Sequence, residues 1–353
     1  MNIIGNNTVC DLEELWWNGS REVVEDIANE CISTSQPNSY VIGYLVWETS
    51  PNDEWKGYVR QLYTLLNNSS RKFVLVLNTV YKATMEQYPF DVVFLDYFLL
   101  RTYYEYKVNG HEYNRKWNSN STKFLFLTGS PERENRIRLL YKFQQVGLLS
   151  ECEWSLFVTD DNIAYCSAYL PELTHDELLE FVKNYSRNAD NITLVDGHYG
   201  GHPYDCGLFA STLFRVITET AFTTKIPLCM SPWVTEKTWM TILNNQPFIM
   251  AGNIGTLEYL SKKGFRTFER YMKCPEYDLI EDDEQRMDAI IENTMHFLKQ
   301  IDVESIADDV RYNHTHFMKL VDDNLTTMRE LLMMIGHETH DPFDVIPLQF
   351  QYE

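Results

Sequence analysis

Short, unbroken runs of apolar residues recur along this chain, and they constrain its fold more than any other feature. Each run is four to seven residues long and lacks the apolar–polar alternation of a strand with one face in water. Such runs are typical of strands buried on both faces of a parallel sheet. They are VIGYLVW (41–47), FVLVL (73–77), VVFL (92–95), FLFLT (124–128), WSLFV (154–158) and PFIMAG (247–252).

The segments between these runs have helical spacing. Residues 132–146 place Ile137, Leu140 and Phe143 along one face, and Gly147 supplies a C-terminal stop. Alternation of strands and helices predicts doubly wound α/β layers. A chain of 353 residues is long enough for two such domains.

A polar stretch divides the chain. Residues 109–123 are rich in Asn and Ser and lack apolar periodicity, which is typical of a linker. We therefore expect an N-terminal domain over 1–118 and a second domain over 119–320. We expect a helical tail over 321–353, and the spacing leaves open whether it packs back on the first domain.

The acidic charge of the chain limits the kinds of partner that it can bind. The net charge is −21, with 51 acidic and 30 basic residues. Because nucleic-acid affinity draws on Lys and Arg neutralising phosphates, this balance disfavours a DNA or RNA partner, and it disfavours anionic membrane surfaces as well.

The location is predicted from what the sequence lacks. The start of the chain lacks a signal-peptide pattern, and no apolar stretch approaches the roughly 20 residues that span a bilayer. The seven cysteines include no CxxC pair. We expect a reduced, cytoplasmic protein without a membrane partner.

Residues 215–268 are the most informative segment for function. Thr235 is a good N-cap, so a helix should begin with Glu236 and Lys237 in its first turn. A lysine there is locally unfavourable, because the helix dipole prefers anions, and it becomes favourable if a phosphate binds at the helix start. The local sequence leaves an alternative open, in which Glu236 only caps the helix and Lys237 is solvated.

The run VTEKTWMTILNNQPFIMAG (234–252) resembles the donor-binding motif of α1,3-fucosyltransferase-like enzymes, in which a Glu-Lys pair opens a helix before a proline-led strand. The resemblance implies that Glu236 holds the donor ribose and Lys237 the diphosphate. Glu219 is similar to an acidic position just upstream in that family. Thr238 and Trp239 depart from the family pattern, so the donor sugar is not carried over as fucose.

A second segment, KFLFLTGSPERENRIRLLYKFQQVGLL (123–149), resembles the part of the family whose arginine reaches the donor phosphate. Arg136 is the first choice for that contact and Arg133 the second. Ser130 and Pro131 suit the N-cap and first positions of the helix. Surface helix charges are the alternative for both arginines.

The resemblance implies the GT-B architecture of two Rossmann-like, doubly wound domains that face a central cleft, with a helical C-terminus. The first domain would bind the acceptor and the second the nucleotide sugar. Inverting transfer also needs a carboxylate base at a strand end of the first domain. Glu48 is the first candidate and Asp96 the second.

Other clusters carry less weight. Asp160 and Asp161 follow a strand and resemble the acidic metal site of the other main glycosyltransferase fold, but a turn or cleft role is the stronger interpretation. His198 and His202 lie in a Gly-rich loop and could ligate zinc, but the stronger interpretation is a cleft loop whose Tyr199 or Tyr204 would stack on the donor base. We expect no metal and no cofactor beyond the nucleotide-sugar donor.

The leading hypothesis is thus a metal-independent, inverting transferase that moves a sugar from a nucleotide-activated donor to a glycan or small-molecule hydroxyl. A second hypothesis changes the acceptor to a hydroxymethylated DNA base, as in phage DNA glycosyltransferases, and the acidic charge counts against it. A third is a non-catalytic nucleotide- or sugar-binding protein.

Overall fold

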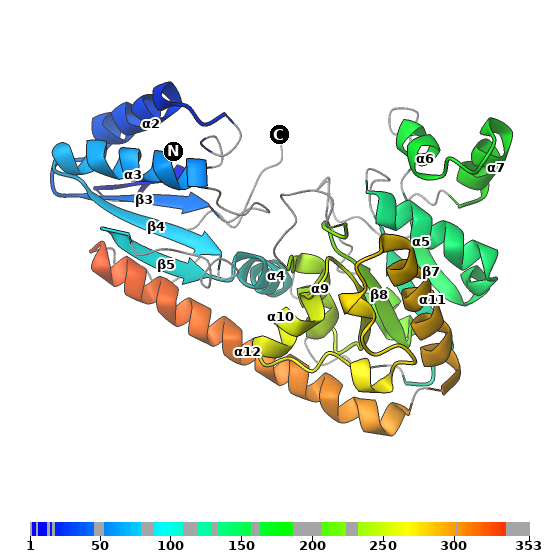
Figure 1. Cartoon of the computed structure of the whole chain (residues 1–353). Coiled ribbons are helices and arrows are strands. Elements are labelled where there is room, and N and C mark those ends of the chain that lie inside the picture. Colours follow the sequence, from blue (N-terminus) through cyan, green and yellow to red (C-terminus); the bar gives the residue numbers. More distant parts are fainter. Residues whose placement is uncertain are drawn as a thin grey trace. The chain divides into compact units, whose positions relative to one another are not determined.

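The computed structural model is an α/β protein with two sheets, each covered by helices (Figure 1). The residues that it describes are 2–4, 6–12, 15, 18–45, 53–78, 88–108, 117, 119–128, 133–156, 158, 163–185, 206–223, 232–300 and 302–336.

The chain divides into two compact units. Unit 1 comprises Met1–Tyr104 with Leu320–Phe350, and unit 2 comprises Glu105–Lys319 with Gln351–Glu353. The first division falls at Tyr104, inside a helix, and not at residue 118 in the polar stretch. The long helix α12 (Val303–Met334) contributes its first half to unit 2 and its second half to unit 1.

The sheet of unit 1 has five strands in the order β1-β2-β3-β4-β5, parallel except for the β1–β2 pair. The run at 41–47 contributes β3, in which every residue after Tyr40 is buried, as expected for a strand covered on both faces. The strands are β1 (Asn2–Ile4), β2 (Asn7–Asp11), β3 (Tyr40–Leu45), β4 (Lys72–Asn78) and β5 (Asp91–Leu95).

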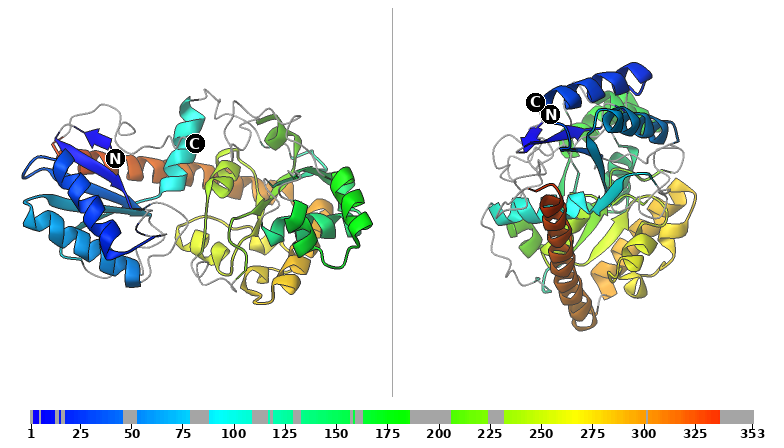
Figure 2. Two further views of the ribbon diagram at one scale, coloured as in Figure 1. Left: turned by 90° about the horizontal axis from the view of Figure 1, so that it is seen from above. Right: turned by 90° about the vertical axis from the view of Figure 1, so that its left-hand side faces the viewer.

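Helices cover both faces of this sheet. α2 (Arg21–Thr34) and α3 (Asp53–Asn68) pack side by side on one face, and the second half of α12 lies on the other (Figure 2). Two hydrogen bonds attach the C-terminal segment: Asn7 Nδ2 donates to Ile335 O over 2.9 Å, and Asp96 N donates to Asn324 Oδ1 over 2.7 Å. The C-terminal helix therefore packs on the first sheet, which the spacing had left open. α4 (Tyr97–Val108) follows β5.

The sheet of unit 2 is fully parallel, with strand order β7-β6-β8-β9. Its strands are β6 (Phe124–Leu127), β7 (Cys152–Ser155), β8 (Phe214–Thr218) and β9 (Phe248–Ala251). The expected strand at 154–158 begins two residues earlier, and β8 was not among the predicted strands. The helices and 3-10 turns are α5 (Glu134–Gln145), η2 (Leu148–Glu151), α6 (Ile163–Tyr169), α7 (His175–Tyr185), α8 (Cys206–Ser211), α9 (Glu236–Leu243), α10 (Thr256–Lys262), η5 (Glu269–Tyr271), η6 (Tyr277–Leu279) and α11 (Asp283–Gln300).

Aromatic packing fills one face of this sheet. Phe124 of β6 stacks on Phe214 of β8 with ring centroids 5.6 Å apart, and Phe143 of α5 meets Phe124 edge-on at 5.1 Å. Phe214 also packs edge-on against Phe297 of α11. α5 and α11 therefore lie on the same face of the sheet, where apolar burial is the main favourable term.

The other face is covered by α9. Its Trp239 is fully buried and packs near Phe265 and Phe317, with ring centroids 5.4 and 6.2 Å away. Because successive side chains of a strand alternate between faces, Phe214 of β8 points to α11, whereas Arg215 points to α9.

Among the described residues, no helix combines the length and apolar character needed to cross a bilayer.

Candidate functional site

The order of strands in unit 2 creates a topological switch point between β6 and β8. The connection from β6 passes through α5 to β7 on one side, and the connection from β8 passes through α9 to β9 on the other. α5 and α9 lie on opposite faces and both begin at the carboxyl ends of their preceding strands. In open α/β sheets, ligands bind in the crevice outside those strand ends. The two segments singled out from the sequence begin α5 and α9.

The start of α9 has the predicted geometry. Thr235 is the N-cap, and its Oγ1 accepts from Lys237 N over 3.5 Å. Glu236 and Lys237 open the helix, as expected.

Lys237 is not a solvated surface charge. The residue is only 8% exposed, and its Nζ donates to Thr235 Oγ1 and Glu236 Oε1, each over 3.0 Å. Burial of a cation in the first turn of a helix is opposed by both desolvation and the helix dipole. The alternative of a merely solvated lysine is therefore wrong, and the placement favours an anion as ligand.

Glu219 follows β8 and is fully buried. Its Oε1 accepts from Thr235 N over 3.0 Å and from Thr238 Oγ1 over 2.5 Å, and its Oε2 accepts from Thr235 Oγ1 over 2.6 Å. A buried carboxylate with three donors is well satisfied. Glu219 therefore holds the start of α9 in place. It has no exposed surface with which to contact a ligand directly.

The start of α5 joins the same cluster through Asn135, whose Nδ2 donates to Glu219 O over 3.4 Å. Arg136 is the next residue and is half-buried, whereas Arg133 is exposed. Arg133 is the N-cap of α5, without a side-chain capping bond. The helix thus begins after the expected N-cap Ser130, and Glu134 supplies the acidic residue that the dipole favours in the first turn.

Sequence reasoning missed Arg215, which is fully buried in β8. Its Nη1 donates to Thr241 Oγ1 over 3.2 Å and to Lys237 O over 3.3 Å. Burial lowers the pKa of this guanidinium to about 10, although the charges of Glu219 and Glu236 oppose that shift. The available signal was an arginine inside the otherwise apolar run FRVIT.

Of the two candidates for the catalytic base, the structure describes Asp96 but not Glu48. Asp96 is 4% exposed and lies directly after β5, where its carbonyl accepts from Leu100 N in the first turn of α4 over 3.0 Å. This is the strand-end position that the sequence predicted. Glu48 and the donor-base candidate Tyr204 lie outside the described residues, as do Ser130 and Pro131.

In the part of the chain that the structure describes, no group of three or more His, Cys, Asp and Glu side chains could hold a metal ion. Asp160, Asp161, His198 and His202 fall outside that part.

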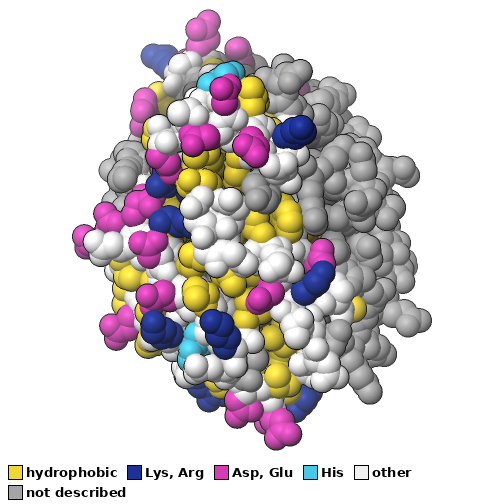
Figure 3. All heavy atoms as spheres, turned by 90° about the vertical axis from the view of Figure 1, so that its right-hand side faces the viewer, with side chains coloured by type: hydrophobic (Ala, Val, Ile, Leu, Met, Phe, Trp, Pro, Cys, Tyr) yellow, Lys and Arg dark blue, Asp and Glu magenta, His cyan; other side chains and the backbone are white. Residues whose placement is uncertain are grey.

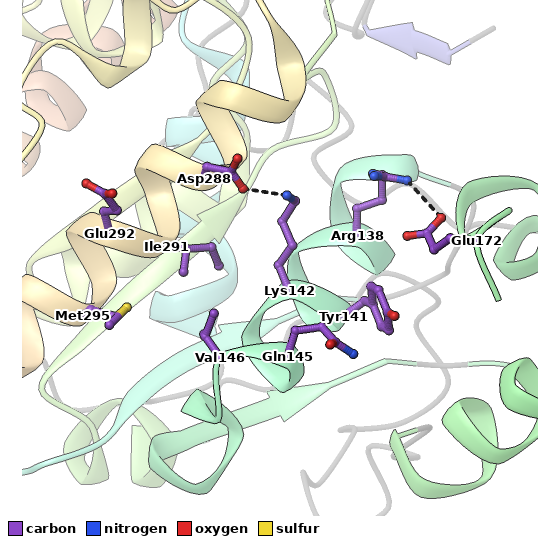
Figure 4. A pocket seen from close by; sticks show the side chains of 10 residues that line it. All are labelled: Arg138, Tyr141, Lys142, Gln145, Val146, Glu172, Asp288, Ile291, Glu292 and Met295. Carbon is purple, nitrogen blue, oxygen red and sulfur yellow. Dashed lines mark hydrogen bonds and ion pairs between the residues drawn. The ribbon is translucent and has the colours of Figure 1, made fainter.

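A cavity of about 450 Å³ lies elsewhere on unit 2, between the outer sides of α5 and α11 (Figure 4). Tyr141, Val146 and Ile291 contribute apolar surface. Lys142 Nζ lies 2.6 Å from Asp288 Oδ1, and Arg138 lies 3.8 Å from Glu172. On the side of the molecule shown in Figure 3, hydrophobic side chains form a band between acidic and basic ones. No residue from the start of α9 lines this cavity.

The switch point in unit 2 therefore gathers a buried lysine, a carboxylate-braced helix start and a neighbouring half-buried arginine. A scan of protein-family models found no match for the chain, and a search of curated proteins found no significant match, so the assignment of this site rests on its own residues and geometry.

Proposed function

We propose that this protein is a glycosyltransferase that moves a sugar from a nucleotide-activated donor to an acceptor hydroxyl. The observation that carries the proposal is the buried Lys237 in the first turn of α9, at the switch point of a parallel sheet. A helix start and a buried ammonium together suit a phosphate. The similarity of this segment to the donor motif of α1,3-fucosyltransferase-like enzymes supports the same assignment.

In the proposed complex, the diphosphate replaces Glu236 as the partner of the Lys237 ammonium. In the structure that ammonium lies 3.0 Å from Glu236 Oε1. Displacement of Glu236 would leave its carboxylate to accept hydrogen bonds from the ribose diol. Arg136 would supply the second cation.

Departure of the nucleoside diphosphate develops negative charge on the phosphate oxygens. Preorganised cations and helix dipoles aimed at that charge lower the barrier, and the removal of one such donor commonly slows turnover about 10²–10³-fold. Lys237, Arg136 and the start of α9 perform this role without a metal in the proposed mechanism.

The rest of the mechanism is inferred from the family resemblance. The arrangement is GT-B, the transfer inverts the anomeric centre, and unit 1 provides the acceptor side. Glu48 is the proposed base and Asp96 the second candidate, each accepting the proton of the acceptor hydroxyl. The acceptor is a glycan or a small molecule, and a hydroxymethylated DNA base is the alternative that the acidic charge disfavours.

A thermal-shift panel of nucleotide sugars tests the donor assignment. A donor present at 100 times its dissociation constant should stabilise the folded protein by about 2.7 kcal/mol. The stabilising donors are then incubated with glycan, small-molecule and hydroxymethylated-DNA acceptors, and sugar transfer is measured. Stabilisation without transfer would identify a binding protein and overturn the enzymatic assignment.

The variant Lys237→Ala separates the site from the fold. We expect it to lose donor stabilisation and transfer while its melting temperature without ligand stays close to that of the wild type. Lys262→Ala is the matched control, because this lysine lies in the same unit with its side chain 72% exposed. Equal activity of the two variants would remove Lys237 from the site.

A further inference from the structure

Two charged residues, Arg215 in β8 and Glu219 directly after it, form hydrogen bonds with successive turns at the start of α9. Residues 215, 217 and 219 share one face of the extended chain, because side chains alternate along a strand. Glu219 holds Thr235 and Thr238 at the top of the helix, and Arg215 holds Lys237 O and Thr241 Oγ1 one turn lower. Both charged residues have no exposed surface.

The contacts of Arg215 are too few to explain a fully buried guanidinium by stability alone. Only Nη1 is hydrogen-bonded, and Nε and Nη2 have no hydrogen-bonding partner among the described residues. The guanidinium carbon lies 5.5 Å from the centre of the Phe209 ring. Well-packed apolar side chains in place of buried charges are often neutral or stabilising. The arginine therefore needs a reason other than stability.

α9 depends on such bracing, since it has only eight residues. Isolated helices of this length are marginal in water, so tertiary contacts decide where the first turn lies. Lys237 O accepts from Thr241 Oγ1 over 2.8 Å and from Arg215 Nη1 over 3.3 Å. These bonds fix the peptide that follows Lys237, and with it the origin of the lysine side chain.

We propose that Arg215 is a positioning residue, which holds the first turn of α9 so that Lys237 is preorganised for an anionic diphosphate. This inference rests on the proposed function for the identity of the ligand. Arg215 does not itself contact the ligand. It acts through the carbonyl of Lys237.

The test compares wild type with Arg215→Met, Arg215→Lys and Arg71→Met. Met removes the charge and donors but keeps an apolar stem, and Lys restores a cation. Arg71 is the matched control, because its guanidinium donates to the carbonyls of Ile32, Ser35 and Ser69, all within unit 1. Two properties are measured: amide hydrogen exchange of residues 237–241 without ligand, and affinity for GDP and UDP by calorimetry.

Arg215→Met should exchange the amides of 237–241 faster than wild type, with a melting temperature near that of wild type. Its affinity for the nucleoside diphosphate should fall about tenfold, because the Lys237 ammonium is no longer held in place. A misplacement of 1 Å can cost about a hundredfold in rate, and we expect a smaller effect on binding. Arg215→Lys should recover part of the affinity. Arg71→Met should melt earlier and keep wild-type affinity.

A lower melting temperature for Arg215→Met with unchanged exchange and affinity would reduce Arg215 to a structural residue and overturn the proposal. Faster exchange with unchanged affinity would also overturn it, because the turn would then not control binding. If wild type binds neither GDP nor UDP, the proposed function is contradicted, and the exchange comparison alone then decides whether Arg215 holds this turn.

Discussion

Two lysines of unit 2, Lys142 and Lys237, lie at opposite ends of their helices, and each belongs to a cluster of charged side chains. Lys142 lies in the last turn of α5, where the dipole favours a cation, and Asp288 and Glu284 lie 2.6 and 3.0 Å from its Nζ. Lys237 lies in the first turn of α9, where the dipole opposes it, and the residue is 8% exposed. The dipole therefore favours the position of Lys142, whereas the dipole and burial both oppose that of Lys237, whose ammonium is partnered by Thr235 and Glu236.

The pKa of Lys142 agrees with its favourable surroundings. Burial alone would lower the pKa of Lys142, but its hydrogen bonds to Asp288 and Glu284 outweigh that effect and raise the pKa. The cations in the cavity of α5 and α11 are thus already neutralised by carboxylates. The buried cation at the start of α9 is the less favourable of the two arrangements, and the proposed site rests on it.

The largest difference is expected between Lys237→Met and Lys142→Met. Loss of the Lys237 ammonium should reduce sugar transfer at least about a hundredfold, because a preorganised charge on the leaving group is removed. Loss of Lys142 should leave transfer within about twofold, since its partners are exposed or half-exposed surface carboxylates. Initial rates at saturating donor measure both, and equal losses would show that the Lys237 ammonium has no special role in transfer.

A second pair of variants compares the carboxylates of the two clusters. Glu219→Gln places an amide where three donors converge in the interior, so we expect destabilisation of about 3 kcal/mol. Glu284→Gln alters a side chain that is 44% exposed, and we expect less than about 1 kcal/mol. Urea unfolding followed by fluorescence gives both values. A Glu219→Gln variant as stable as wild type would show that the carboxylate does not hold the start of α9.

Much of the fold could be predicted because its signals are local. The runs 41–47, 73–77 and 124–128 contain the strands β3, β4 and β6, since a segment apolar on both faces has few other stable places. β8 was missed because Arg215 interrupts the apolar pattern. The acceptors of that arginine, Lys237 O and Thr241 Oγ1, lie more than twenty residues away in sequence, so no local pattern shows them.

The candidate site was predictable in part for the same reason. The N-cap Thr235 and the pair that follows it are local signals, and they correctly predicted where α9 begins. The burial of Lys237 was not predictable, because it depends on how β8 and α9 pack. The start of α5 was placed too early, since Ser130 and Pro131 suit a helix start by type.

Asp278 is a buried carboxyl group outside both clusters, and we expect its titration to make the stability of the protein depend on pH. Burial raises the pKa of Asp278 to about 7, although its Oδ2 accepts from Leu257 N, which lowers the pKa. The unfolded chain releases this proton near pH 4 and the folded protein near pH 7. The contribution of Asp278 to stability therefore falls as pH rises through this window and stays low above it.

Asp278→Asn should remove that fall. At pH 8 its melting temperature should exceed that of wild type by about 2–4 °C, the equivalent of 1 kcal/mol in a domain of this size. At pH 4 the two proteins should differ little, because the wild-type carboxyl is then protonated in the folded state. Scanning calorimetry from pH 4 to 8 measures the difference, and a variant less stable at pH 8 would show that the carboxylate is favourable there.

The smallest effect is expected from salt on the cation cluster of α5. The Lys142 side chain is 22% exposed, and its partner Asp288 is 66% exposed. Such pairs contribute about 0.2–1 kcal/mol and are screened as the Debye length falls to about 3 Å at 1 M salt. Lys142→Met should therefore be slightly less stable than wild type at low salt and equal to it at 1 M.

The stability difference between Glu219→Gln and wild type should persist at 1 M salt, because water and ions do not reach that carboxylate. If salt removed both differences, the hydrogen bonds of Glu219 would be no better shielded than a surface ion pair, and the distinction between the two clusters would not hold.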